Sequence, residues 1–154
     1  MNKLLSIIIP VNNQEKLIVR ALDSIPRRKD IQVVVVDDGS TDNTVRVVEE
    51  YIQKVRGMLD TELYLMGEDV GVGLTRNKAL DMCKGLYIHG LDSDDYLITH
   101  AYEKAMNKLD GSTDIVYIDL EINSGTCLRL NPSTTRIFCA FTTKFVRREF
   151  IGDI

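Results

Sequence analysis

The sequence predicts an α/β fold in which a mostly parallel sheet carries helices on both faces. Two observations lead to this prediction. Near-continuous runs of β-branched residues, typical of strands buried on both faces, alternate with stretches of helical period. The resulting β-α-β-α-β-α-β order joins parallel strands through crossover helices. At 154 residues, the chain has the length of one domain.

The elements of the first half follow from their apolar patterns. The predicted strands are Leu4–Ile9, Ile31–Val36, Glu62–Met66 and Leu86–Gly90. Between them, apolar residues recur three or four positions apart, as on amphipathic helices. The predicted helices are Leu17–Ile25, Asn43–Arg56 and a stretch that follows the glycine loop Gly71–Gly73 and ends near Lys84.

The second half begins with another helix and ends in a small β-hairpin region. Tyr102 and Leu109 lie seven positions apart, with Ala105 and Met106 between them, which predicts a helix. Asp114–Glu121 alternates apolar and polar residues, as a half-exposed strand does. A turn at 123–125 joins it to a second strand over Thr126–Leu130.

Composition excludes several classes of protein. The net charge of −4 has the wrong sign for a general nucleic-acid binder, so no nucleic-acid partner is expected. Three cysteines at unrelated spacings (Cys83, Cys127, Cys139) form neither a disulfide framework nor a zinc signature. No apolar run has the roughly 20 residues of a membrane helix. We therefore expect a soluble, cytoplasmic segment without a membrane span.

Polar residues follow each of the four strands of the first half. Because ligands bind at the carboxyl ends of strands in open α/β sheets, these loops are expected to form one site. They include Asn12, the pair Asp37-Asp38, Arg76 and the acidic run Asp92–Asp95. Four polar clusters that converge on one sheet edge favour a binding site more strongly than any single cluster does.

The pair Asp37-Asp38 has two interpretations. The turn that follows contains Gly39 and possible helix caps at Ser40 to Asp42, so a purely structural strand-to-helix turn explains part of the pattern. Two carboxylates at a strand end are not needed for such a turn. They are also suited to accept hydrogen bonds from a nucleobase or from ribose hydroxyls.

The acidic run also leaves two interpretations open. Asp92, Asp94 and Asp95 repel one another unless a cation or hydrogen-bond donors neutralise them, which favours a hard divalent cation that bridges to phosphate. The alternative is a solvated acidic turn before the next helix. A calcium loop of EF-hand type is excluded, because Leu97 stands where that loop needs glycine.

The remaining charged residues carry weaker signals. Arg76 lies close to two glycines at the start of a helix, where it is suited to hold a phosphate, although helical arginines often only face solvent. His89 and His100 have no metal-ligand spacing and are interpreted as structural. Lys144–Arg148 is predicted to form a basic patch on a helix that faces solvent.

Together the four loops resemble the inverting family 2 glycosyltransferases of the Rossmann-like GT-A fold. The segments that carry the resemblance are SIIIPVN (6–12), VVDDGSTD (35–42), GVGLTRN (71–77) and YIHGLDSDD (87–95). The resemblance implies transfer of a sugar from a nucleoside diphosphate sugar, with a UDP-sugar favoured, to a hydroxyl of a saccharide or lipid-linked acceptor. Polysaccharide biosynthesis is the implied context.

The resemblance also assigns roles to residues. Pro10 and Asn12 would lie near the nucleotide, with Asp37 or Asp38 accepting a hydrogen bond from the base. Arg76 would lie near the diphosphate. Asp92 and Asp94 match the D-x-D motif of the family. Asp92 would face the ribose or sugar, and Asp94, with Asp92 as a second candidate ligand, would bind Mg²⁺ or Mn²⁺.

No catalytic base is identified, since the family's base would be expected beyond Ile154. We therefore expect residues 1–154 to be a truncated GT-A domain, with a donor half over about 1–97 and the start of an acceptor half over about 98–154. The parent enzyme would act in the cytoplasm, with association at the inner face of the membrane. Two alternatives are a non-catalytic nucleotide-sugar-binding module and a receiver-like phosphorylation switch. The second lacks the expected lysine and gives Arg76 no role.

Overall fold

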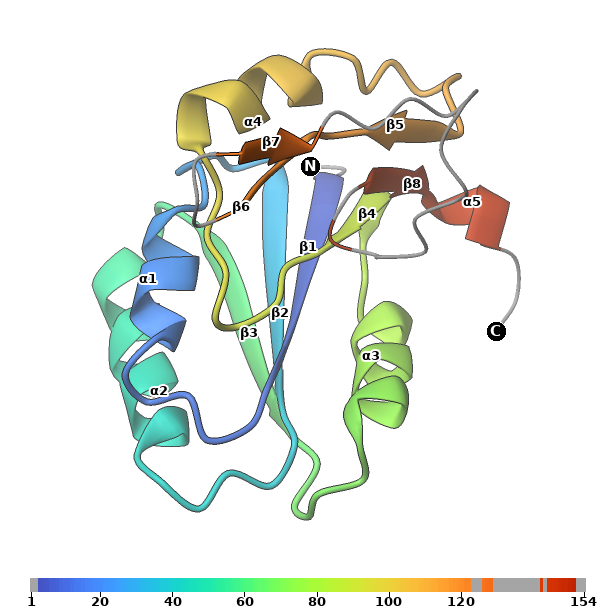
Figure 1. The fold of residues 1–154 in the computed structure, drawn as a ribbon. Helices are drawn as coiled ribbons and strands as arrows, with labels where there is room; N and C mark the ends of the chain where they lie inside the picture. The colour runs from blue at the N-terminus through green and yellow to red at the C-terminus, as the bar shows by residue number, and fades with distance from the viewer. Residues whose placement is uncertain (1–2, 123–125, 129–141, 143, 152–154) are drawn as a thin grey trace.

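The protein forms a six-stranded mixed sheet with helices on both faces (Figure 1). The computed structural model describes residues 3–122, 126–128, 142 and 144–151. In spatial order the strands are β3 (Asp60–Leu65), β2 (Ile31–Asp37), β1 (Lys3–Val11), β4 (Gly85–Gly90), β8 (Lys144–Arg147) and β5 (Ile115–Tyr117). A separate antiparallel ribbon consists of β6 (Leu120–Ile122) and β7 (Thr126–Leu128).

The four strands of the first half pair in parallel, as the sequence predicts. β1 lies between β2 and β4, with Ile8 opposite Val34 on one side and Gly90 on the other. β3 extends the parallel part beyond β2. β8 pairs antiparallel with both β4 and β5. The predicted α/β class is therefore confirmed, with two antiparallel contacts at one side of the sheet.

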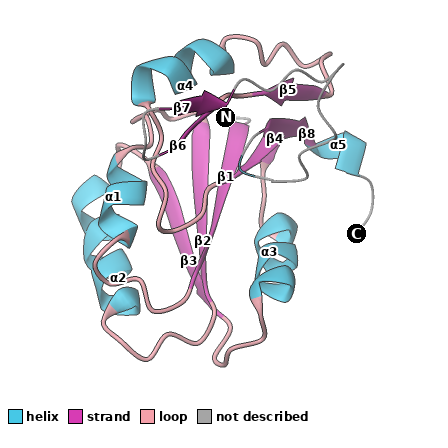
Figure 2. Ribbon diagram, in the orientation of Figure 1, coloured by secondary structure: helices cyan, strands magenta, loops and turns pink. Residues whose placement is uncertain are grey.

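The helices divide between the two faces (Figure 2). The ranges are α1 (Ile18–Asp23), α2 (Thr44–Val55), α3 (Val72–Asp81), α4 (Thr99–Met106) and α5 (Arg148–Ile151). Because strand side chains alternate between faces, Val33 and Val35 pack with residues of α1, α2 and α4. Val34 and Val36 pack with α3 and with Ile151 of α5.

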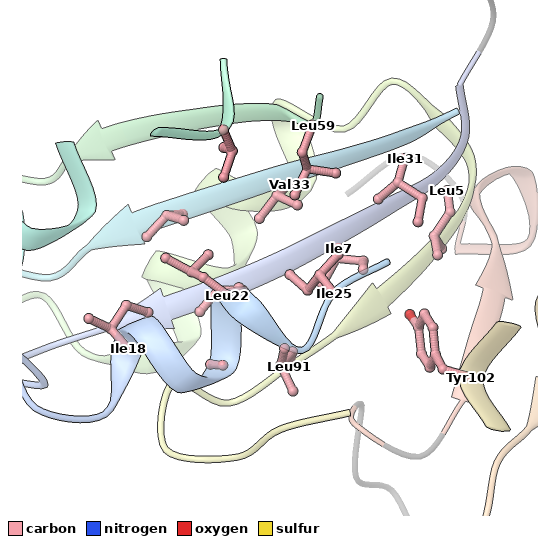
Figure 3. Close-up of a cluster of buried hydrophobic side chains, with 14 of the residues drawn as sticks. Leu5, Ile7, Ile18, Leu22, Ile25, Ile31, Val33, Leu59, Leu91 and Tyr102 are labelled. Carbon is pink, nitrogen blue, oxygen red and sulfur yellow. The ribbon is translucent and has the colours of Figure 1, made fainter. Parts of the chain in front are cut away.

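The larger core holds the loop after β4 in place. Ile7, Leu22, Ile25 and Leu91 belong to one buried cluster, and Leu91 lies between β4 and the acidic run (Figure 3). A fully buried leucine or isoleucine contributes about 1.5–3 kcal/mol through removal of apolar surface from water. The hydrophobic core thus anchors the first residue of the loop after β4.

A buried polar network joins the amino-terminal ends of the parallel strands. The Ser6 hydroxyl donates to the Gln32 side-chain oxygen at 2.6 Å, and the amide of Gly85 donates to the Ser6 Oγ at 2.8 Å. The Gln32 amide nitrogen donates to Glu62 of β3 at 3.1 Å. These bonds satisfy polar groups inside an apolar sheet, at the end opposite the candidate site.

Two predictions about the second half are wrong in detail. Lys144–Arg148 does not form a basic helical patch: Lys144–Arg147 is strand β8. Phe145 is fully buried in the core, and the burial of this side chain favours the strand over the helix. Arg147 pairs with Asp114, and Arg148 donates to the carbonyl of Cys83 at 2.8 Å.

The strand predicted over 114–121 is divided in two. Its first part, β5, joins the main sheet beside β8, and its last part, β6, pairs with β7. The predicted hairpin is present as the β6–β7 pair, whereas its turn at 123–125 lies outside the described residues. Among the described residues, no helix has the length and apolarity needed to cross a membrane.

Candidate functional site

Four loops and the start of α3 make up the candidate site. β1, β2, β3 and β4 run in the same direction, so the loops that follow them emerge at the same end of the sheet (Figure 1). α3 begins at this end, directly after the loop that follows β3. The structure therefore places the predicted residues of all four loops on one side of the molecule.

Asn13 ties the loop after β1 to the loop after β2. Its backbone has a left-handed φ of 51°, a conformation that asparagine tolerates better than most residues. The Asn13 side-chain oxygen accepts hydrogen bonds from the amides of Thr41 at 2.8 Å and Asp42 at 3.2 Å. The backbone amide of Asn13 donates to the Ser40 hydroxyl at 2.9 Å. These hydrogen bonds join the loop after β1 to the loop after β2.

Glu15 adds a second connection between these two loops. Its carboxylate accepts hydrogen bonds from the backbone amide of Asn43 at 2.9 Å and from the Asn43 side chain at 2.8 Å. These bonds lower the pKa of Glu15, with the backbone bond as the largest cause. The sequence interpretation assigned no role to either Asn13 or Glu15. An asparagine directly after a strand was the signal available for Asn13.

Pro10 and Asn12 lie at the end of β1. Pro10 pairs with Val36 of β2 and is half-buried. The Asn12 amide nitrogen donates to the carbonyl of Asp38, and its side-chain oxygen accepts from the Asn13 side chain at 2.9 Å. Asn12 therefore supports the backbone of the Asp37-Asp38 turn. Direct contact of either residue with a nucleotide stays a prediction.

The two aspartates at the carboxyl end of β2, Asp37 and Asp38, are both buried but have different partners. One Asp37 oxygen, Oδ2, accepts the amide of Ser40 at 3.0 Å and closes the turn, and its other oxygen is sealed in the interior without a hydrogen bond. Asp38 Oδ1 accepts the amide of Val70 at 2.9 Å, and its Oδ2 has no hydrogen bond within the described chain. Asp38 thus reaches toward the loop that leads into α3.

Gly39 allows the loop that leads into α3 to pack closely on the turn after β2. Its φ is +72°, and a β-carbon at this position would lie 2.6 Å from the backbone nitrogen of Asp69. Any other residue would combine an unfavourable backbone conformation with a clash against backbone atoms. The glycine lets residues 68–70 pack directly on the turn, which brings the Val70 amide to Asp38.

Arg76 of α3 and Asp92 form an ion pair at the candidate site. The Arg76 Nη2 and Asp92 Oδ1 atoms are 2.8 Å apart, and the two side chains are 35% and 41% exposed. At this exposure the pair contributes little to stability, because water screens both charges. The sequence predicted both residues at this edge, but their direct pairing depends on the fold.

The acidic run forms a tight turn directly after β4. The amide of Asp95 donates to the carbonyl of Asp92 at 3.0 Å. Asp94 is exposed, and its carboxylate has no hydrogen bond or ion pair within the described chain. The pKa of Asp95 is raised, first by desolvation and then by the charges of Asp94 and Asp92. Negative charge therefore accumulates at this turn.

The residues present fit a divalent cation only with additional oxygen ligands. The described part of the chain contains no group of three metal-ligating side chains. Mg²⁺ is commonly bound in proteins by one or two carboxylates together with substrate phosphates and water. The exposed carboxylate of Asp94 beside Asp92 meets this requirement when a diphosphate supplies the remaining oxygens.

His89 is buried three residues before Asp92 and belongs to the interior. Its Nε2 lies 3.2 Å from the carbonyl of Thr142, so Nε2 donates and Nδ1 accepts the hydroxyl of Tyr102. Its ring centroid is 4.9 Å from that of Phe145. Burial lowers the pKa of His89 to about 4. A neutral histidine thus links β4 to α4 and to the segment before β8.

Comparison with known proteins is consistent with this arrangement. Residues 6–152 match glycosyl transferase family 2. The chain belongs to this family. Its match with the chondroitin synthase of Escherichia coli has 36% identity over 110 residues, which is 68% of this chain and 15% of that protein. The matched part of the poly(ribitol-phosphate) β-N-acetylglucosaminyltransferase TarS of Staphylococcus aureus is 33% identical over 121 residues, 75% of this chain and 21% of TarS.

Solved structures show that this family 2 chain has the GT-A-like fold of TarS. The crystal structure of S. aureus TarS in complex with UDP-GlcNAc matches with a TM-score of 0.79 and 28% identity, over 96% of this chain and 46% of that one. A mannosyltransferase from Pyrobaculum calidifontis in complex with GDP-Man and Mn²⁺ matches with a TM-score of 0.65 and 27% identity, over 74% of this chain and 34% of that one. The chain spans only about 15–21% of the curated relatives described above.

Proposed function

We propose that this chain binds the donor of a glycosyltransferase, a nucleoside diphosphate sugar, at the candidate site. The observation that carries the proposal is the convergence of Asp38, the Arg76–Asp92 pair and the exposed Asp94 at one end of the parallel sheet. A UDP-sugar is the favoured donor, because TarS, which matches 96% of this chain, was crystallised with UDP and with UDP-GlcNAc.

Asp38 is the proposed contact to the base. Asp37 already uses one oxygen to close the turn, and its other oxygen is sealed in the interior. Asp38 reaches toward the α3 side of the sheet, where Arg76 also lies, and its Oδ2 has no hydrogen bond to any described residue. A donor that lies between the Asp38 turn and α3 would place its base at Asp38 and its diphosphate near Arg76.

Arg76 and Asp92 have complementary roles in this proposal. The Arg76 guanidinium presents several donors in a planar fork, which suits the oxygens of a diphosphate. Its pairing with Asp92 at 2.8 Å holds it at the candidate site before a ligand arrives. Asp92 is then placed to accept hydrogen bonds from ribose or sugar hydroxyls. During transfer, Arg76 would stabilise the negative charge that develops on the departing diphosphate.

Asp94, with Asp92 as a second candidate, would hold Mg²⁺ or Mn²⁺ together with the diphosphate. When bound, such a cation supplies Lewis-acid stabilisation of the leaving group. The mannosyltransferase that matches this fold was crystallised with Mn²⁺ and GDP-Man, which supports the proposal. We further propose that residues up to about 97 form the donor half and that residues from about 98 begin the acceptor half.

The reaction proposed for the whole protein is transfer of the sugar to a hydroxyl of a saccharide or lipid-linked acceptor, with inversion. This reaction needs a general base on the face of the sugar opposite the leaving group. The roles proposed for Arg76, Asp92 and Asp94 concern donor binding, so donor binding is the step to measure on this chain.

Calorimetric titration of UDP, GDP and dTDP, each with and without Mn²⁺, tests the proposal. We expect UDP to bind and Mn²⁺ to increase its affinity, because the ion neutralises charge between Asp94 and the diphosphate. If GDP or dTDP binds strongly and UDP does not, the proposed donor site stands, but its donor carries that nucleotide instead of UDP. Absence of binding for all three nucleotides would contradict the proposed function.

A further inference from the structure

The acidic turn after β4 is held from α1 as well as from α3. Arg20 of α1 donates a hydrogen bond from Nη2 to the backbone carbonyl of Asp94. The Arg20 guanidinium carbon also lies 5.1 Å from the centre of the Tyr96 ring, within the range of a cation–π contact. One side chain therefore contacts two residues of the same loop.

The residue that caps the carboxyl end of α1 holds the loop a few positions further along. The hydroxyl of Ser24, at the carboxyl end of α1, accepts the backbone amide of Leu97 at 2.9 Å. The carbonyl of Ser24 accepts the Thr99 hydroxyl at 3.0 Å. Residues four positions apart lie on the same side of a helix. Arg20 and Ser24 therefore contact the same loop at two points, Asp94 and Leu97.

The helix that carries Arg20 is itself rigidly placed. Ile18, Ala21 and Leu22 of α1 are fully buried against the sheet. An exposed arginine is usually a solvated surface residue. Arg20 differs, because within the described chain it forms no close ion pair: its guanidinium contacts a backbone carbonyl and an aromatic ring, and its charge acts on the Asp95 carboxylate at longer range.

The turn is thus fixed from both helical layers. On one side of the sheet, Arg76 of α3 holds the side chain of Asp92 at 2.8 Å. On the other side, Arg20 of α1 holds the peptide that follows the Asp94 α-carbon. The bond from the Asp95 amide to the Asp92 carbonyl closes the turn between these points. The backbone orientation at Asp94, and with it the direction of its β-carbon, is set by these contacts.

We propose that Arg20 is a positioning residue that aims the Asp94 carboxylate at the bound diphosphate and its cation. This inference rests on the proposed function, since it gives Asp94 a ligand to hold. The contacts of Arg20 with the turn are to the Asp94 backbone carbonyl and the Tyr96 ring, not to the Asp94 carboxylate. Arg20 acts through the Asp94 carbonyl, so its loss frees the turn to rotate while Asp92, Arg76 and Asp38 keep their own partners.

The test compares Arg20→Ala and Arg20→Lys with the matched control Arg46→Ala. Arg46 is an exposed arginine of α2 whose one ion pair with a described residue is to Glu50, at 3.4 Å. UDP and uridine are titrated into each protein with and without Mn²⁺. We expect Arg20→Ala to raise the Kd for UDP in Mn²⁺ about 10-fold, the low end of the loss seen when a residue that orients a metal ligand is removed. Uridine affinity should not change.

The Arg20→Lys variant helps to distinguish a loss of loop positioning from a loss of folding. Its ammonium retains a donor for the Asp94 carbonyl but lacks the planar group that lies over Tyr96, so an intermediate Kd is expected. Arg46→Ala should bind as the unaltered protein does. In the ligand-free protein, hydrogen exchange of the Asp95 and Leu97 amides should accelerate in Arg20→Ala, while the amides of α1 exchange at their original rates.

The outcomes distinguish the inference from the function on which it rests. If the unaltered chain binds UDP with Mn²⁺ and Arg20→Ala binds it equally well, Arg20 has no positioning role and the proposed function stands. An equal loss for uridine and UDP would also overturn the role, because it would indicate general damage to the fold. If the unaltered chain binds no nucleotide, the proposed function fails and the role of Arg20 fails with it.

Discussion

Replacement of His89 by glutamine should remove a defined part of the acid sensitivity of this protein. His89 is buried among Tyr102 and Phe145, and its pKa falls from 6.5 to about 4 because burial disfavours the charged ring. In the unfolded chain the ring titrates near 6.5. Between pH 6.5 and 4 the unfolded state therefore binds a proton that the folded state does not, so stability falls as the pH decreases.

The size of this effect follows from the pKa change. At 1.36 kcal/mol per pKa unit, the fall from 6.5 to about 4 corresponds to about 3 kcal/mol of folding free energy that is present above pH 6.5 and lost by pH 4. Glutamine retains an amide donor for the carbonyl of Thr142 but does not titrate. The variant should lose about 1 kcal/mol at pH 7 through poorer packing and hydrogen bonding.

Urea denaturation at half-unit steps from pH 7 to pH 4 measures the difference. The carboxylates contribute equally to the pH dependence of both proteins. The difference between their free energies of unfolding at each pH therefore reports on His89. We expect the gap between the unaltered protein and His89→Gln to close as the pH falls, and then to reverse, with a total change of about 3 kcal/mol. Parallel curves over this range would refute the assignment of a neutral, buried His89.

Three further substitutions test the candidate site. Asp94→Asn should abolish the Mn²⁺ dependence of UDP binding while the Tm stays nearly unchanged, because Asp94 is exposed; unchanged dependence in calorimetry would contradict the metal role. Arg76→Ala should weaken UDP binding at least 10-fold and uridine binding little, and an equal loss for both would place Arg76 away from the diphosphate. Gly39→Ala should cost about 3 kcal/mol in urea denaturation, because it adds a backbone clash at 2.6 Å to a φ of +72°. Gly57→Ala, with a φ of +82° but no neighbouring atom within 4 Å, should cost only about 1 kcal/mol; equal costs would show that the close approach to Gly39 is unimportant.

The parallel core was predictable because its sequence signal is local. β-Branched runs such as Val33–Val36 indicate strands buried on both faces, and the helices between strands have a clear apolar period. The segment Lys144–Arg147 was predicted wrongly, because its charged ends resemble an exposed helix. The strand is favoured by tertiary interactions: the pairing of β8 with β4 and β5, and the contacts of Phe145 with His89 and Tyr102. The buried pair Ser6 and Gln32 also follows from tertiary structure.

For the candidate site, too, some features could be predicted from the sequence and others could not. A general rule for parallel sheets predicts that the loops holding Asp38, Arg76 and Asp92 converge. The contacts made between loops by Asn13 and Arg20 connect residues 28 and 74 positions apart in the sequence. No periodicity or composition reveals such pairs. Sequence reasoning therefore predicted which loops converge but not the residues that hold these loops together.

Paramagnetic broadening by Mn²⁺ is the sharpest test of a cation-assisted donor site at Asp94. Amide spectra of the ¹⁵N-labelled chain with UDP are recorded before and after Mn²⁺ is added, with Mg²⁺ as the diamagnetic control. We expect broadening of the amides of residues 92–95 and of the loop that leads into α3. The amides of Lys84 and Gly85, at the opposite end of the sheet, should remain sharp. Broadening centred elsewhere, or none in the presence of bound UDP, would contradict a cation-assisted donor site at Asp94.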